Sequence, residues 1–349
     1  MSEKNTLQKW AGKKGWFIPV LLTTSLILNI LGLILPFLEI DEAFKSPIIY
    51  SLPHSVKLMW DAKLYIIAGL ILSFSIIFPF AKLIALYLAW FLPWNSSTRV
   101  KFLHVIELLG KWSYMDIFVV ILLIALTNKQ QWISSQIHIG VFFFISAITL
   151  SMLISQAVIT IAKREAEKIT PALKTSSKVW LIRDNLKISW VVPVLAIISG
   201  AALIESFHAE FLQIHQVFLV SRSYSIYLIV EMLQSMHEWL LLAILVLTLG
   251  VLPIIRLLIL ISIWIIPMKL ATHQKMREVI DSFSRWCMLD VFGLALFLVA
   301  TEGKELVKTK VLSGLYIVVI AIGLSYLLAA MAILISRALT TLRPSDEVI

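Results

Sequence analysis

The sequence is poor in cysteine and in charge, and each shortage excludes a class of protein. Its one cysteine, Cys287, allows neither an internal disulfide nor a cysteine-based zinc site. Only 15% of the 349 residues are charged and 60% are hydrophobic, which is too apolar for a water-soluble protein of this size. There is no glycine-rich phosphate loop, so we do not expect ATPase activity within this chain. The composition instead predicts a protein of the lipid bilayer.

Long apolar runs indicate membrane-spanning helices, because crossing about 30 Å of hydrocarbon takes about 20 helical residues. The runs and their breakers predict an all-α polytopic membrane protein with eight helices. Their ranges are 16–38, 64–92, 103–126, 137–162, 190–207, 238–266, 279–300 and 311–337. The first run follows several lysines, as in a secretory signal. It is longer than a signal segment and lacks a small-residue cleavage site, so we expect it to remain as an anchor.

The distribution of basic residues predicts the orientation of these helices. Lysine and arginine are concentrated at the amino terminus, around Arg99 and Lys101, from Lys163 to Lys187, and after the sixth and eighth helices. The alternate loops contain more acids, such as Glu39. Since basic loops stay on the inner side, both termini are predicted to be cytoplasmic. The net charge of +9 is therefore assigned to membrane topology and not to nucleic-acid binding.

The chain repeats itself at a spacing of 174 residues, which separates Pro79 from Pro253 and Lys82 from Arg256. The same spacing pairs Trp16 with Trp190, Trp112 with Trp286, Asp116 with Asp290 and Phe118 with Phe292. Four helices in each copy make the repeat parallel rather than inverted. We therefore predict two tandem four-helix transmembrane modules, residues 1–162 and 190–349, joined by a basic cytoplasmic linker, residues 163–189.

A small external β element is predicted between the first two helices of each module. The segments FLEIDEAF, from Phe37 to Phe44, and FLQIHQVF, from Phe211 to Phe218, are equivalent in position and partly alternate apolar with polar residues. The segment SYSIYLIV, from Ser223 to Val230, is also rich in strand-forming residues. Short apolar stretches are equally compatible with helix, so periodicity alone does not decide between the two.

Two cations in apolar helices are the strongest candidates for function. Lys82 lies about ten residues, or about 15 Å, from its helix end. A charge at the bilayer centre costs at least ~2.5–3.5 kcal/mol, so a partner or a water-filled cavity is required. The predicted partner is Asp116 on the next helix, and Arg256 and Asp290 form the duplicate pair. Lys82 is titratable, whereas an arginine keeps its proton, so the first module is the better candidate for a working cycle.

Helical spacing extends this polar network. Ser75 shares the face of Lys82 two turns earlier, Ser113 lies beside Asp116, and Ser151 on the fourth helix completes the seam. The second module has Thr248, Arg256, Cys287, Asp290 and Ser325. These residues either form a working polar site or only fix helix register. The single Glu-x-x-His spacing, Glu205 to His208, lacks the second copy of a di-iron site, so no metal or cofactor is predicted.

Prolines and tryptophans recur with the charges. Pro79 and Pro253 are predicted to kink their helices. The interfacial aromatic belts are predicted to contain Trp90, Trp112, Trp264 and Trp286.

The motif Trp-x-x-x-Asp-x-Phe occurs twice, in LLGKWSYMDIFVVILLIAL at 108–126 and in SFSRWCMLDVFGLALFLVA at 282–300. Together with the preceding Pro-x-x-Lys helix and basic loop, it resembles the paraquat-inducible protein A family, which includes the LetA transporters. The resemblance covers both modules and nearly the whole chain. It implies an inner-membrane protein of Gram-negative bacteria that passes phospholipid to or from a periplasmic MCE-domain partner, whose tunnel carries lipid between the membranes.

The resemblance also implies which residues line an intramembrane site. They are Lys82, Ser113, Asp116 and Ser151, with Arg256, Asp290 and Ser325 as counterparts. Family members usually carry cysteine-rich zinc ribbons, but the amino-terminal tail and the linker contain no cysteine, so zinc-dependent structure is not expected. The alternative function is a membrane scaffold that anchors or assembles the MCE partner and moves no lipid. An enzyme is not expected, because metal and nucleophile constellations are missing.

Overall fold

The computed structural model describes residues 6–42, 47–127, 133–169, 178–179, 190–215, 221–266, 268–306 and 309–341. Among these residues, eight helical stretches are long and apolar enough to cross a bilayer. Within those ranges the stretches are Phe17–Ile34, Ala68–Phe91, Ser96–Thr127, Ile139–Glu165, Val191–His208, Trp239–Ile265, Glu278–Ala300 and Gly314–Ala332. The mostly helical, eight-span prediction is therefore confirmed. The chain divides into two compact units, one mainly from residues up to 172 and one mainly from residues after 172. The module boundaries and their parallel orientation stay predictions.

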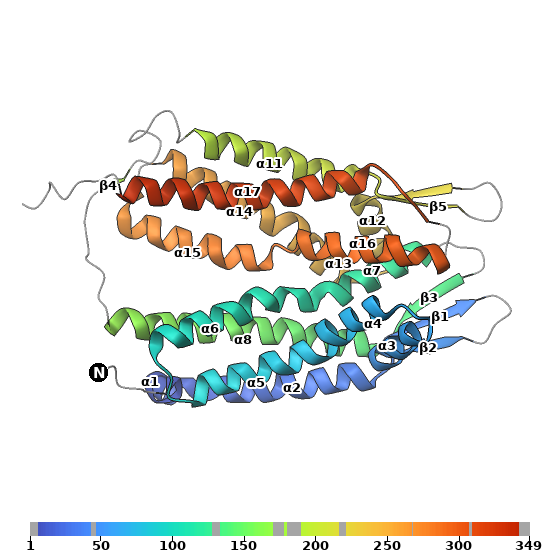
Figure 1. Cartoon of the computed structure of the whole chain (residues 1–349), viewed down its shortest axis with the longest axis horizontal. Helices are drawn as coiled ribbons and strands as arrows, with labels where there is room; N and C mark the ends of the chain where they lie inside the picture. The colour runs from blue at the N-terminus through green and yellow to red at the C-terminus, as the bar shows by residue number, and fades with distance from the viewer. Residues whose placement is uncertain are drawn as a thin grey trace, which may run out of the picture. The chain divides into compact units, whose positions relative to one another are not determined.

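The first unit is built on four long helices that run side by side (Figure 1). Its elements are α1 (Leu7–Ala11), η1 (Gly12–Trp16), α2 (Phe17–Ile34), α3 (Leu52–Asp61), α4 (Tyr65–Ile71), η2 (Leu72–Ile77), α5 (Phe78–Phe91), α6 (Ser96–Gly110), η3 (Lys111–Tyr114), α7 (Met115–Thr127) and α8 (Ile139–Ile169). Because α8 continues to Ile169, the first part of the predicted linker is helical. Residues 170–177 and 180–189 of that linker lie outside the described residues.

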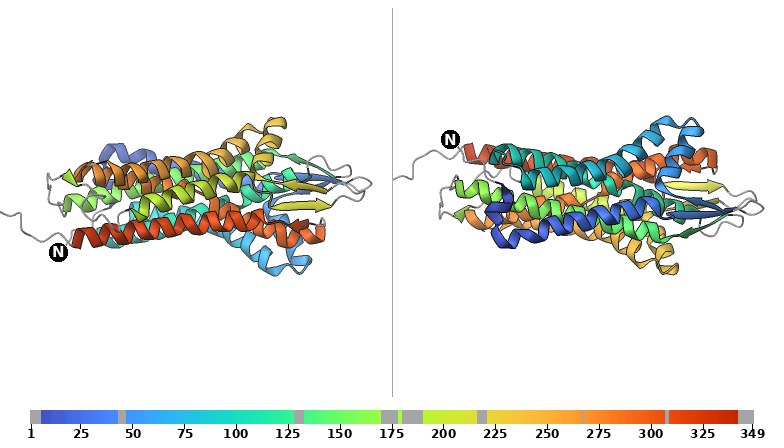
Figure 2. Two further views of the ribbon diagram at one scale, coloured as in Figure 1. Left: turned by 90° about the horizontal axis from the view of Figure 1, so that it is seen from above. Right: turned by 90° about the horizontal axis from the view of Figure 1, so that it is seen from below.

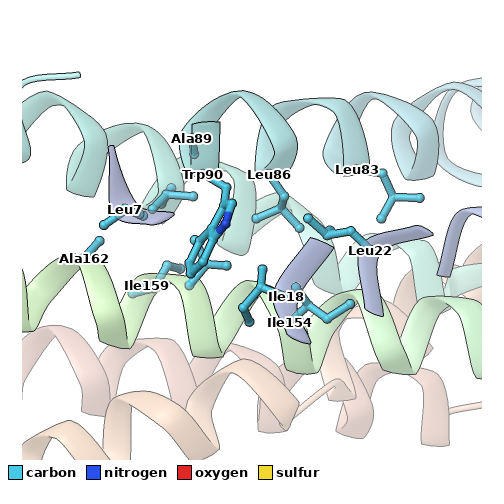
Figure 3. Close-up of a cluster of buried hydrophobic side chains, with 12 residues drawn as sticks. Leu7, Ile18, Leu22, Leu83, Leu86, Ala89, Trp90, Ile154, Ile159 and Ala162 are labelled. Atoms are coloured by element: carbon cyan, nitrogen blue, oxygen red, sulfur yellow. The ribbon is translucent and has the colours of Figure 1, made fainter. Parts of the chain in front are cut away.

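The core of the first unit surrounds Trp90, which is 0% exposed. Figure 3 shows its ring among Leu7, Ile159 and Ala162, which belong to one cluster of buried apolar side chains. Gly15 makes room for the ring, since a Cβ there would lie 3.0 Å from it. The aromatic-belt prediction is therefore wrong for Trp90, and also for its counterpart Trp264, which is 3% exposed.

A buried ion pair ties the start of α6 to the end of α8. Arg99 Nη1 lies 2.6 Å from Glu165 Oε2, and the two side chains are 0% and 5% exposed. Arg99 Nη2 also donates to the carbonyls of Leu92, at 3.4 Å, and Trp94, at 3.2 Å. The guanidinium thus fixes the turn between α5 and α6 as well as the two helices. Arg99 is one of the basic residues used to predict orientation, and its charge is buried within the protein.

The helices of the second unit follow the order of α2 to α8 in the first, except that its described residues contain no counterpart of η3. Its helices are α11 (Val191–His208), α12 (Ile226–Ser235), α13 (Trp239–Val246), η4 (Leu247–Val251), α14 (Leu252–Ile265), α15 (Leu270–Trp286), α16 (Leu289–Leu306) and α17 (Gly314–Thr341). The pairs α2 and α11, α3 and α12, and α5 and α14 each begin and end at residues 174 apart, as 17 and 191 do. Two non-glycine residues with positive φ, Lys63 (64°) and His237 (62°), have the same spacing.

Each unit carries a three-stranded antiparallel sheet beyond one end of its long helices (Figure 2). In the first unit the strands are β1 (Leu38–Glu42), β2 (Ile48–Tyr50) and β3 (Ile133–Ile137), in the order β2-β1-β3. In the second unit they are β5 (Leu212–His215), β6 (Ser221–Tyr224) and β8 (Thr309–Val311), in the order β6-β5-β8. Leu38 pairs with Tyr50 and Ile137. Leu212 pairs with Tyr224 and Val311, in the same register. In the second unit, β4 (Lys178–Val179) also pairs with β7 (Met268–Lys269).

The small sheets confirm the predicted β element, with two corrections. The prediction of strand from Ser223 to Val230 is wrong after Tyr224, because α12 begins at Ile226. Ser225 caps that helix by accepting a hydrogen bond from the Leu228 amide at 3.2 Å. The third strand of each sheet, from the segment before the last long helix, was not predicted. Residues 43–44 and 216–218 of the predicted segments lie outside the described residues.

Alanine at Gly140 is expected to destabilise the junction between the sheet and α8. The Gly140 amide donates to the Pro36 carbonyl at 3.0 Å, and a Cβ at Gly140 would lie 2.4 Å from that oxygen. Because backbone cannot move aside cheaply, we expect Gly140→Ala to lower the free energy of unfolding by about 1–3 kcal/mol. Gly69→Ala is the matched control, since a Cβ there meets no atom within 4 Å and helical alanine is favoured by roughly 0.5–1 kcal/mol. Thermal unfolding in detergent measures both, and equal melting temperatures would contradict the prediction.

Candidate functional site

Lys82 is held inside the first unit by three helices. Its side chain is 2% exposed, and Nζ donates to Ser151 Oγ on α8 at 3.1 Å. Ser151 donates onward to the Ile148 carbonyl at 2.8 Å. A Cβ at Gly110 on α6 would lie 3.1 Å from Nζ, so the ammonium packs against a position without a side chain. The cation therefore reaches a neutral hydroxyl within the membrane-spanning part of the unit.

The second unit contains the same contact. Arg256 Nη1 donates to Ser325 Oγ at 3.2 Å, and these residues are half-buried. In both units the donor and the acceptor are 69 residues apart. The structure thus brings together the predicted residues Lys82 and Ser151, and likewise Arg256 and Ser325. Recurrence of one cation–serine contact at equivalent positions indicates that both units have the same local architecture.

The direct pairing of Lys82 with Asp116 is not formed. Among the described residues, no ion pair within 4.0 Å joins them. The ammonium lies at the level of Gly110, whereas Asp116 follows six residues later, beyond the 3-10 segment η3. Six helical residues correspond to about 9 Å, which explains why the two charges do not meet.

Glu107 is the acid whose charge attracts Lys82. It lies on α6 and is 4% exposed. Its Oε2 lies 4.0 Å from Nδ1 of the exposed His104. Sequence reasoning missed Glu107, although the signal was present: it is an acid within a membrane span, the same criterion that selected Lys82.

Asp116 lies with two serines in a second buried polar group. Asp116, Ser75 and Ser113 are 6%, 0% and 2% exposed. The Ser75 hydroxyl interacts with the Asp116 carboxyl group, although Ser75 Oγ and Asp116 Oδ2 both lack a partner in hydrogen-bonding geometry within the described residues. Ser113 Oγ also lacks one there. The Ser75 hydroxyl is therefore the polar neighbour of the Asp116 carboxyl group, and Ser113 Oγ is a further buried oxygen without a hydrogen bond within the described residues.

The counterpart of Asp116 is bonded differently. Asp290 is half-buried, its Oδ2 accepts a short hydrogen bond from the Tyr326 hydroxyl, and its Oδ1 accepts from the Val291 amide at 3.0 Å. The Thr248 hydroxyl donates to the Ile244 carbonyl of its own helix at 2.7 Å. Cys287 is half-buried. Arg256 and Asp290 thus contact neighbouring positions of α17, Ser325 and Tyr326, through these hydrogen bonds.

Both proline positions follow a π-helical segment, η2 in the first unit and η4 in the second. The Phe78 amide bonds the Ser73 carbonyl, and the Leu252 amide bonds the Leu247 carbonyl, five residues back in each case. Pro79 and Pro253 have no N–H for the next acceptor in this register. The predicted kinks are therefore turns of widened helix.

The third span of each unit is interrupted opposite its π-helical segment. In the first unit η2 packs against the 3-10 segment η3. In the second unit the Met288 amide, between α15 and α16, donates to the Thr248 carbonyl at 3.3 Å. Irregular backbone at membrane depth is tolerated only where protein covers it or water reaches it, and π-turns are frequent at functional sites. In the first unit, Ser75 belongs to η2, Ser113 belongs to η3, and Asp116 follows η3 in the first turn of α7.

The sequence profile of the paraquat-inducible protein A family matches residues 18–160 and 189–337, which is most of the chain. The chain belongs to the paraquat-inducible protein A family. The resemblance drawn from the repeated Trp-x-x-x-Asp-x-Phe motif is thereby confirmed.

Curated relatives of this family member are transport proteins by name. Intermembrane transport protein PqiA of Escherichia coli K12 is 30% identical over 140 residues, 38% of this chain and 33% of that protein. Lipophilic envelope-spanning tunnel protein A of the same organism is 28% identical over 92 residues, 25% of this chain and 22% of that protein. A probable intermembrane transport protein of Haemophilus influenzae is 31% identical over 94 residues, 26% of this chain and 23% of that protein. The matched segments thus span a third or less of these relatives. No solved structure matches the chain.

Proposed function

We propose that this chain is the inner-membrane component of a lipid transport system, with both termini in the cytoplasm. In this proposal it passes phospholipid to or from a periplasmic MCE-domain tunnel protein. Support comes from family membership and from relatives named for intermembrane transport and for an envelope-spanning tunnel. The chain acts on its cargo by binding it and letting it move, without chemical conversion.

The cation–serine contact within the membrane carries this proposal. The cation–serine hydrogen bonds have a charged donor and a neutral acceptor, whereas a phosphate oxygen carries an opposite charge and adds Coulomb attraction that a hydroxyl lacks. A phospholipid phosphate is therefore able to displace Ser151 from Lys82, and Ser325 from Arg256. Lysine and arginine are both suited to phosphate, arginine through a planar fork and lysine as a point charge. The serines hold the cations in place when no headgroup is bound.

The remaining members of the network have supporting roles. Ser75, Ser113 and Asp116 supply polar oxygens near the interrupted backbone, and Asp290 is their counterpart in the second unit. A polar cavity lined by these groups tolerates a headgroup within the membrane, while the acyl chains stay in hydrocarbon. The sequence alternative, a scaffold that moves no lipid, requires the same buried groups to be purely structural.

Reconstitution distinguishes the transporter from the scaffold. Proteoliposomes containing the full chain and a labelled phospholipid are mixed with the purified MCE partner and unlabelled acceptor vesicles. We expect labelled lipid to reach the acceptor only when both proteins are present. Co-purification of the two proteins without any chain-dependent lipid transfer would replace the transport proposal with the scaffold.

A further inference from the structure

We propose that the amino-terminal hook of the first unit binds the headgroup of an anionic phospholipid in the adjacent membrane leaflet. The hook consists of α1 and η1, residues 7–16, and directly precedes the first membrane-spanning stretch, Phe17–Ile34. A surface hollow of about 460 Å³ on the hook is lined by Gln8, Lys9, Gly12 and Trp16. Its assignment to the cytoplasmic leaflet rests on the proposed orientation, whereas headgroup binding rests neither on orientation nor on lipid transfer.

The hook is a folded part of the first unit. Leu7 is 0% exposed and belongs to the cluster of buried side chains around Trp90 (Figure 3). Thr6 caps α1 by accepting a hydrogen bond from the Lys9 amide at 3.3 Å. The φ angle of 58° at Gly12, in the left-handed region, turns the chain from α1 into η1. The side chains of the hollow are therefore held by a defined backbone, which lowers the entropic cost of binding a ligand.

The hollow contains hydrogen-bond donors and no acid. The Lys9 ammonium, the Gln8 amide and the Trp16 indole N–H are donors, and all three side chains are exposed. Lys9 Nζ forms no ion pair with the described residues. The sequence has no Asp or Glu from residue 6 to residue 38, and η1 contains two further lysines. This concentration of positive charge favours a headgroup with a net negative charge over a zwitterionic one.

Apolar side chains next to the hollow favour a lipid over a free anion. Trp16 is 72% exposed and directly precedes the span, at the position where tryptophan is enriched in membrane proteins. Val20 and Ile27 are exposed on the same face of α2, four and eleven residues later. A phosphate group held by Lys9 therefore belongs to a ligand whose acyl chains run along α2, and free phosphate lacks these contacts.

The sequence of the hook is not repeated in the second unit. At the spacing of 174 residues, Gly12 corresponds to Leu186 and Gly15 to Ser189. In the first unit the positive φ at Gly12 favours glycine, and a Cβ at Gly15 would lie 2.8 Å from the Ala11 Cβ. Because both glycines are replaced, the proposal concerns the first unit alone.

Lipid binding is measured on the purified full chain in detergent by native mass spectrometry. The probes are phosphatidylglycerol, which is anionic, and phosphatidylcholine with the same acyl chains. We expect saturable binding of phosphatidylglycerol that is at least about fivefold tighter, since one basic residue near an anionic headgroup contributes about that factor. Inorganic phosphate tests the other source of the anion. Displacement of phosphatidylglycerol by an equal concentration of inorganic phosphate would overturn the assignment to a lipid.

Matched variants locate the bound lipid. Lys9→Gln is expected to weaken phosphatidylglycerol binding at least about fivefold and to leave thermal unfolding without lipid unchanged, because the side chain is exposed. Trp16→Phe removes the indole N–H and should weaken binding by about two- to tenfold. Lys101→Gln removes an exposed lysine from α6 and should have no effect.

Three outcomes would overturn the proposal. The first is equal binding of the two lipids by the wild-type chain, and the second is unchanged binding by Lys9→Gln. The third is an equal loss in Lys9→Gln and Lys101→Gln, which would indicate a general effect of surface charge. The Lys9→Gln effect is also expected to persist in a Lys82→Met background. Its disappearance there would assign the bound lipid to the contact within the membrane and not to the hook.

Discussion

Lys82→Met is expected to lower phospholipid transfer by at least about tenfold while leaving protein abundance unchanged. Methionine keeps the packing against Gly110 but removes the charge that binds a phosphate. Losing a charge-assisted hydrogen bond of about 1.5–3 kcal/mol corresponds to about a 10- to 100-fold effect. Stability should not fall, since a charge within the membrane costs at least ~2.5–3.5 kcal/mol and its removal relieves that cost. The reconstituted transfer assay and quantitative blotting of membranes measure the two quantities.

Two controls sharpen this prediction. Lys82→Arg retains the charge and copies Arg256 of the second unit, so it should keep most of the transfer unless release of a proton from Lys82 is required. Lys101→Met removes an exposed charge from α6 and should have no effect. Full transfer by Lys82→Met, or a loss of abundance equal to its loss of transfer, would show that the buried cation is structural.

Arg99→Met is expected to destabilise the first unit by about 3–5 kcal/mol, the cost of leaving a buried charge without its partner. Glu165, which is 4% exposed, would keep its negative charge in an apolar region. The Leu92 and Trp94 carbonyls would also lose a donor. The effect should appear as a lower melting temperature in detergent and lower abundance in membranes.

The double variant Arg99→Met, Glu165→Leu tests the physical reason. Replacing both members of a buried ion pair with apolar residues is often neutral, so much of the lost stability should return. A double-mutant cycle with Glu165→Leu measures the coupling energy. If the double variant is as unstable as the sum of the two single variants, the ion pair contributes no coupling and the prediction fails.

Periodicity and length were sufficient to predict the helices, because about 20 consecutive apolar residues have few alternatives to crossing a bilayer. The strands of the two small sheets were harder to predict than the helices. Leu38 to Glu42 alternates and was predicted as strand, but the Ile226 to Val230 stretch is helical because Ser225 caps it. The sequence contains that helix-start signal, a serine directly before an apolar run, but the strand-forming residues of the stretch favour the opposite interpretation.

The site was predictable as a set of residues and not as a set of contacts. The spacing of 174 residues predicted that Ser151 and Ser325 are equivalent positions. Ser151 accepts a hydrogen bond from Lys82, and Ser325 accepts one from Arg256. The Lys82–Asp116 pair failed because η3 interrupts the third span, and no periodicity rule anticipates that break. The prediction that Trp90 belongs to an aromatic belt was wrong for a related reason. Its ring packs against Gly15, and sequence periodicity does not predict such a close approach between distant segments.

The register shared by the two copies, without insertion from α2 through the sheet strands to the start of α17, gives every residue an internal reference. Positions with similar chemistry in both copies, such as Lys82 with Arg256 and Ser151 with Ser325, make the same contact in each unit. Positions with different chemistry, such as Ser75 with Leu249, are where the two units differ. Each unit can therefore serve as the control for a substitution in the other, because it has equivalent helices with a different side chain at the matched position.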